Sequence, residues 1–127
     1  MTEDEIQRGI ITSKNPKTQT YWFKRNITDL KDNVDDKLAK NFIDKQGGNL
    51  DNEAVAFTED LKMNKITDVL PDENITTYDV KWLPEHGINP EVSSEHQEYL
   101  DKLCSDFYRV LIKMIDDGIE ERFVNFC

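Results

Sequence analysis

Histidine and cysteine are the residue types in this sequence best suited to metal binding or nucleophilic chemistry. The chain has two of each: His86, His96, Cys104 and Cys127. No two of them have a zinc-ligand spacing such as Cys-x-x-Cys or His-x-x-x-His. His96 and Cys104 share one predicted helix but would lie roughly 12 Å apart, too far for a base to reach a thiol. We therefore predict no metal site, no cofactor and no nucleophilic centre, with both histidines on the surface and Cys104 in the core.

A run of carboxylates is the next candidate for chemistry. Its members are Asp29, Asp32, Asp35 and Asp36. The run lacks the glycine and the terminal glutamate of a calcium loop, and Asp35 suits a helix N-terminus instead. Gly47-Gly48 is not followed by the Lys-Ser/Thr of a phosphate-binding loop. We predict that this glycine pair ends a helix.

Composition restricts the class of partner. The 127 residues carry 16 Lys and Arg against 26 Asp and Glu, a formal net charge of -10. This charge repels nucleic-acid phosphates and anionic lipid, so we expect neither nucleic acid nor a membrane as partner. The first residues have no basic and apolar regions typical of a secretory signal, and two cysteines do not make a disulfide framework. These features predict one domain at most, in the cytoplasm.

Two segments have the pattern of β-strands. Residues 20–27 are rich in aromatic and β-branched types, and residues 76–82 alternate strictly, with Tyr78, Val80 and Trp82 on one face. Helices between them allow the strands to run parallel. A two-stranded sheet is marginal in water, so the chain is expected to be part of a larger α/β sheet.

Helical periodicity predicts three main helices. They cover residues 34–43, residues 51–61 with Ala54, Phe57 and Leu61 buried, and residues 94–121. Asp51 would cap the second helix. The pair Ser94 and Gln97 would form the capping box of the third.

The third helix carries a broad apolar stripe, expected to be buried along its length. Its members are Tyr99, Leu100, Leu103, Cys104, Phe107, Leu111, Met114 and Ile115. Five aromatic residues are candidates for lining a pocket, but at these spacings we expect them in the core: Trp22, Tyr78, Trp82, Phe107 and Tyr108. The predicted fold is therefore α/β, a partial parallel sheet of about two strands flanked by helices, with residues 1–92 as a partial domain and residues 93–127 as a long amphipathic helix.

Several short segments together resemble a known family. They are Glu5-Ile6, Gly9-Ile10, Tyr21-Trp22-Phe23-Lys24-Arg25, Ile27-Thr28-Asp29-Leu30, Tyr78-Asp79-Val80-Lys81-Trp82, Gly87-Ile88-Asn89-Pro90-Glu91, His96, Tyr99-Leu100 and Leu103-Cys104-Ser105-Asp106-Phe107-Tyr108. In this order they resemble the NACHT and WD-repeat family of signal-transduction NTPases (STAND type). The likeness is to the latter part of the N-terminal TIR-like α/β domain of unknown function and the linker toward the NACHT module.

The resemblance implies a role without catalysis, because the nucleotide motifs of the family belong to a part absent from this chain. We expect a regulatory or protein-interaction segment that docks on neighbouring domains of a larger protein. The predicted interaction face consists of Leu100, Leu103, Phe107 and Leu111.

Two alternatives stay open. By fold-level analogy with TIR-like enzymes, the chain could act on NAD or nucleotides through a carboxylate of Glu53, Asp60 or Glu95. It could also be a standalone adaptor that binds a peptide along the edge of the strand over residues 20–27.

Overall fold

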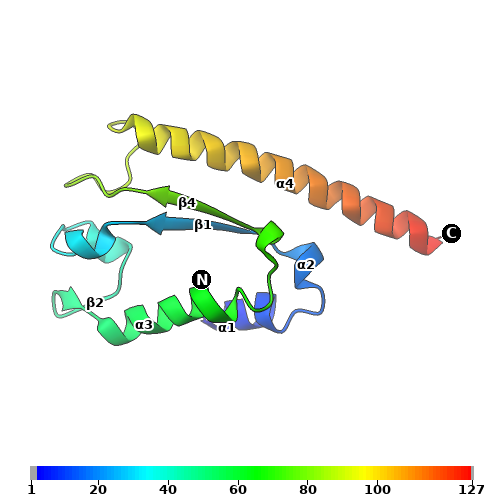
Figure 1. Ribbon diagram of the computed structural model, residues 1–127, viewed down its shortest axis with the longest axis horizontal. Helices are drawn as coiled ribbons and strands as arrows, with labels where there is room; N and C mark the ends of the chain where they lie inside the picture. Colours follow the sequence, from blue (N-terminus) through cyan, green and yellow to red (C-terminus); the bar gives the residue numbers. More distant parts are fainter. Residues whose placement is uncertain (1–2, 127) are drawn as a thin grey trace.

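The computed structural model describes residues 3–126 and shows a mixed α/β fold in which more than half of the chain is helical. A two-stranded sheet has the long helix α4 (Ser94–Phe126) along one side and the helices α1 (Glu3–Ile6) and α3 (Asn52–Asp60) on the other (Figure 1). The remaining elements are η1 (Gln7–Ile11), α2 (Pro16–Gln19), β1 (Trp22–Ile27), η2 (Leu30–Asn33), η3 (Ala39–Asn41), β2 (Lys45–Gln46), β3 (Asn49–Leu50), η4 (Leu61–Lys65), η5 (Asp72–Asn74) and β4 (Ile75–Val80). The predicted fold class is confirmed.

The central sheet consists of the parallel strands β1 and β4. Their first residues, Trp22 and Ile75, lie opposite each other, and so do their last, Ile27 and Val80. The backbone N–H of Thr28 extends the ladder by donating to the carbonyl of Val80 at 3.0 Å. Aromatic and β-branched residues favour the extended backbone in both strands. The predicted parallel pair is confirmed, and so is the burial of Tyr78 and Trp82. Val80, on the same face of β4, is buried as well.

A hydrophobic cluster covers the side of the sheet opposite α4. Its buried members are Leu61, Ile66 and Leu70, and partly buried hydrophobic residues pack against them: Ile6, Ile10, Ile11, Trp22 and Ile75. Leu61 and Ile66 are five residues apart. The π-helical turn η4 suits this spacing, because i to i+5 bonding brings residues five apart onto one face.

Helix α3 begins as predicted, but one residue that was expected in its buried face is exposed. The Asp51 carboxylate accepts a hydrogen bond from the backbone N–H three residues later at 3.0 Å, which caps the helix. The prediction that Phe57 is buried is wrong, because its side chain is 45% exposed. The more buried line of the helix runs through Val55, Thr58 and Leu61, which turns Phe57 toward solvent.

The prediction of a helix over residues 34–43 is also wrong, because the only helical turn within this range is the short 3-10 turn η3, while η2 ends just before it. Asp36 accounts for the difference. Its carboxylate accepts hydrogen bonds from the N–H of Leu38 at 2.9 Å, Nε1 of Trp82 at 3.0 Å and the N–H of Glu85 at 2.8 Å. These three bonds lower the pKa of Asp36 and hold the segment in a non-helical path.

The glycine pair predicted to end that helix is instead a hairpin turn. Strands β2 and β3 pair antiparallel on either side of Gly47 and Gly48. The φ angles of the two glycines are 59° and 84°, and a two-residue hairpin turn of type I′ needs positive φ at both positions. The positive φ angles therefore belong to a hairpin turn, and the prediction of a helix end is wrong.

The first turn of α4 differs from the prediction by one residue. The hydroxyl of Ser93, not that of Ser94, accepts from the backbone N–H of His96 at 3.3 Å. The side chain of Gln97 donates to Oδ1 of Asp101 at 2.8 Å, and so has no part in a capping box. The predicted long helix itself is confirmed.

Substitution of two glycines tests how far the stability of the fold depends on the loop after β4. Gly87 has a φ of 68°, and a Cβ there would lie 3.3 Å from the ring of buried Trp82. We expect Gly87→Ala to reduce the free energy of unfolding by about 1–2 kcal/mol or more, because it combines a left-handed backbone with a close contact.

Gly118 is the matched control, since it lies in α4 and a Cβ there meets nothing within 4 Å. Gly118→Ala should raise the free energy of unfolding by about 1 kcal/mol through helix propensity. Urea unfolding followed by circular dichroism measures both changes. Equal effects of the two substitutions would show that the loop at Gly87 does not constrain the fold.

Candidate functional site

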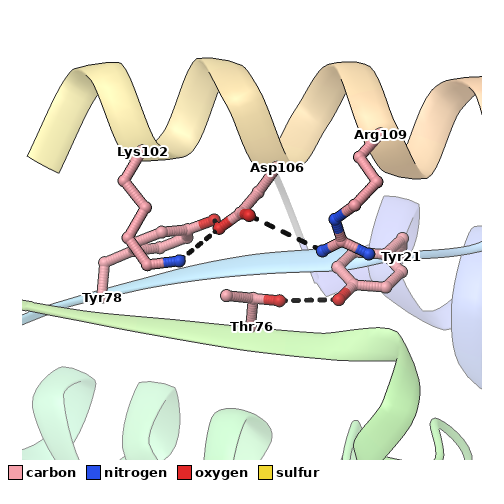
Figure 2. Close-up of polar contacts among 6 residues, drawn as sticks. All are labelled: Tyr21, Thr76, Tyr78, Lys102, Asp106 and Arg109. Carbon is pink, nitrogen blue, oxygen red and sulfur yellow. Dashed lines mark hydrogen bonds and ion pairs between the residues drawn. The ribbon is translucent and has the colours of Figure 1, made fainter.

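A polar cluster at the middle of the sheet attaches α4 to β4. The hydroxyl of Tyr78, on β4, donates to Oδ2 of Asp106, on α4, at 2.7 Å. Lys102 donates to the same oxygen at 2.8 Å, and Arg109 lies 3.6 Å from Oδ1 (Figure 2). The Asp106 carboxylate therefore joins one buried donor from the sheet to two cations of its own helix.

The electrostatics of this cluster suit a structural clamp. The hydrogen bonds from Lys102 and Tyr78 hold the pKa of Asp106 below its ordinary value. Burial, followed by the bond to Asp106, raises the pKa of Tyr78 well above 10.0. The proton therefore stays on the phenol at neutral pH, with the carboxylate ionised. Such a pair holds the helix on the sheet and has no proton to exchange near neutrality.

His96 fixes the start of α4. The side chain is 3% exposed, its Nδ1 accepts from the N–H of Asn89 at 3.0 Å, and its Nε2 donates to the carbonyl of Lys81 at 2.7 Å. The prediction of a surface histidine is wrong for His96, because the loop after β4 folds back and offers both a donor and an acceptor.

The environment of Cys104 also differs from the prediction. Its thiol is exposed, so the prediction of a core thiol is wrong. His96 faces the loop after β4 and both of its ring nitrogens are bonded, so the structure does not bring these two side chains together. Cys127 lies outside the described residues. Within residues 3–126, no group of three or more His, Cys, Asp or Glu side chains could hold a metal ion.

Two clefts lie near the carboxyl ends of the strands. The larger, of about 660 Å³, lies between the end of β1 and α3, where Lys31 and Glu59 form an ion pair at 2.6 Å. The smaller, of about 200 Å³, is lined by residues that include Glu95 and His96. Neither cleft holds an unpartnered buried polar side chain among the described residues.

The three carboxylates considered for catalysis do not meet. Glu53 and Asp60 lie on α3, and Glu95 lies on the first turn of α4, across the sheet (Figure 1). All three side chains are exposed. Asp60 accepts a hydrogen bond from Asn64 at 2.7 Å, whereas Glu53 borders a third, shallow hollow on the outside of α3. The structure thus places them in three separate surroundings.

The most distinctive surface is the side of α4 that faces away from the sheet. Large apolar side chains recur there, and we call them the outer stripe: Tyr108, Ile112, Ile115, Ile119, Phe123 and Phe126. At 3.6 residues per turn they fall within about 80° of the helix circumference. Their exposed fractions range from 42% at Ile112 to 92% at Phe126. The sheet-facing side of the same helix runs through Leu103, Asp106 and Val110, nearly opposite.

The predicted interaction face lies between these two sides of α4. Leu100 and Leu103 are partly buried, and Phe107 contacts Phe23 of β1 with ring centroids 5.7 Å apart. Leu111 is 43% exposed and borders the outer stripe. The expectation that the helix stripe is buried along its whole length is wrong, because the sheet ends before the helix does. Tyr108 and Phe107 are likewise not core residues.

The outer stripe was missed except for Ile115, although its signal is present in the sequence. Ile112, Ile119 and Phe123 repeat at helical spacing on the side opposite Leu103 and Val110. A helix with apolar residues on two sides needs cover on both. That pattern indicates a second packing surface.

No protein-family model, curated protein or solved structure matches this chain. Within the described residues, no helix has both the length and the apolar run needed to cross a membrane.

The Tyr78 clamp predicts a specific alkaline response. Because the folded state raises the pKa of Tyr78, the clamp stabilises the fold fully below pH 10.0 and loses that contribution as the pH rises further. We expect Tyr78→Phe to cost about 1 kcal/mol at neutral pH, and this difference from wild type to shrink in alkali.

Urea unfolding at neutral pH and above the ordinary tyrosine pKa measures this difference. Tyr108→Phe is the control, because the side chain of Tyr108 is 68% exposed, and it should change stability little at either pH. A difference between wild type and Tyr78→Phe that is constant with pH would contradict the clamp.

Proposed function

We propose that this chain is a non-catalytic protein-interaction segment that binds a protein partner through the outer stripe of α4. The observation that carries the proposal is a continuous line of six exposed large apolar side chains on a helix already anchored by its other side. Contiguous exposed apolar surface of this kind is typical of protein–protein contact sites.

Energetics favour a covered stripe. Full burial of one isoleucine or phenylalanine side chain contributes about 1.5–3 kcal/mol. The five isoleucine and phenylalanine side chains of the stripe are 42–92% exposed, so they forgo a contribution that is a large part of the whole stability of a small domain, about 5–15 kcal/mol. A partner that presents its own apolar surface recovers part of this energy, after the entropy cost of association.

The net charge of the chain indicates the class of partner, and its cysteine usage indicates the cellular compartment. A net charge of -10 disfavours nucleic acid and anionic membrane surfaces, which leaves a protein surface as the cover. The absence of a disulfide framework supports a cytoplasmic setting. The resemblance to NACHT and WD-repeat proteins makes the proposed function more specific, because it implies that the segment regulates a larger switch protein.

A second candidate function has its own observation. β4 is the only strand that pairs with β1 in the described part of the chain. Because Thr28 donates to Val80, the backbone groups of Phe23, Arg25 and Ile27 point toward the other edge of β1. An open strand edge favours a peptide-binding adaptor, and hydrogen-exchange protection of these three amides by a partner would support it.

Photo-crosslinking tests the proposed function directly. Benzoyl-phenylalanine replaces Phe123 in the outer stripe or, as the control, the exposed Phe57 of α3. In cells that express the chain, we expect a protein adduct at position 123 and little at position 57. The adduct should be lost when Ile112→Asp and Ile119→Asp are added, because charge in the stripe opposes apolar contact. Equal adducts at both positions, or none at position 123, would contradict the proposal.

A further inference from the structure

Resting on the proposed function, a more specific partner can be named. We propose that the outer stripe binds a second copy of this chain, with the two α4 helices side by side and antiparallel. A second copy fits this surface because the apolar residues from Cys104 to Phe123 and the charged residues beside them are each arranged symmetrically along the helix.

The exposed apolar residues of α4 have the same spacing in either direction along the helix. From Cys104 through the outer stripe to Phe123, the steps between successive residues are 4, 4, 3, 4 and 4, and each side chain is exposed: Cys104, Tyr108, Ile112, Ile115, Ile119 and Phe123. A helix laid antiparallel on its own copy therefore sets Ile112 opposite Ile115, Tyr108 opposite Ile119 and the small Cys104 opposite Phe123. Between Cys104 and Phe123, every apolar position meets an apolar position, whereas Phe126 falls opposite Asp101. The smallest side chain of the line, that of Cys104, meets the ring of Phe123.

The charged flank of the stripe has the same symmetry. Arg109, Lys113, Asp116 and Glu120 lie on one flank at steps of 4, 3 and 4, with the bases in the first half and the acids in the second. Antiparallel pairing brings the same flank of both helices together, so Arg109 and Lys113 of each copy lie beside Asp116 and Glu120 of the other. All four side chains are exposed and free to contribute across the interface.

Existing ion pairs do not oppose this arrangement. Arg109 pairs with Asp106 at 3.6 Å and Lys113 pairs with Asp117, both within the helix. The side chains of Arg109 and Lys113 are 64% and 71% exposed, so each cation can approach a second carboxylate without leaving the first.

A parallel pair would lack this complementarity. It would set the charged flank against the opposite flank, where Leu111 and Gly118 carry no charge. The antiparallel pair is also free of obstruction, because the sheet and the other helices lie on one side of α4 and the last turns of the helix extend past the strands (Figure 1). The two α/β bodies then lie on opposite sides of a central helix pair, in an isologous dimer.

The first test measures mass in solution. Wild type should sediment as a concentration-dependent dimer, and Ile115→Glu should weaken self-association by at least ~10-fold, since it places a charge at the centre of the apolar line. Phe57→Glu, at an exposed aromatic residue of α3, should leave the dimer intact. Circular dichroism melts verify that both variants fold. A monomeric wild type, or a dimer indifferent to Ile115→Glu, would overturn the proposal.

The second test measures orientation by charge exchange. The variant Arg109→Glu with Lys113→Glu makes the flank wholly acidic, and Asp116→Lys with Glu120→Lys makes it wholly basic. Each should dimerise several-fold more weakly than wild type at low salt, whereas the mixture should form heterodimers at least as well as wild type. No recovery on mixing would overturn the antiparallel arrangement.

The two proposals fail in different ways. A monomeric wild type whose position 123 crosslinks to a different protein would remove the second copy as partner and keep the interaction function. A monomer that gives no adduct at position 123 but binds neutral lipid vesicles would remove both. An adduct of twice the chain mass at position 123, absent from Ile115→Glu, is the result expected here.

Discussion

The smallness of the sheet is the constraint on which the rest of the structure depends. Two parallel strands of six residues each give a ladder about 20 Å long, which has too few hydrogen bonds and too little buried surface to persist uncovered. Both faces therefore need apolar cover. The cluster of Leu61, Ile66 and Leu70 covers one face, and α4 covers the other. The attachment of α4 thus decides whether the sheet exists and which residues are left outside.

Two polar anchors set both the position and the rotation of α4. His96 bonds to the loop after β4, and Asp106, about 15 Å further along the helix, accepts from Tyr78 of the sheet. A helix held at two points on one side cannot rotate without breaking a bond. Its 33 residues extend about 50 Å, more than twice the length of the strands, so the distal half of α4 has no sheet to cover it.

Local signals predicted much of this fold. Strict alternation gave β4, aromatic enrichment gave β1, and the carboxylate of Asp51 marked the start of α3. The segment over residues 34–43 could not be read locally, because Asp36 finds its partners Trp82 and Glu85 almost fifty residues later. The burial of His96 depends on the same kind of distant partner.

The rotation of α4 shows why the interaction surface was harder to predict than the helix. Apolar residues lie on two sides of α4, and periodicity alone gives no reason to choose between them. The structure chooses the side that carries His96 and Asp106, because each polar group there finds a partner with matching geometry. Apolar contact is non-directional and tolerates either rotation, whereas a buried hydrogen bond does not. The side left exposed is consequently the one without polar anchors, where Ile112, Ile115 and Ile119 can be covered by whatever surface has a complementary apolar line.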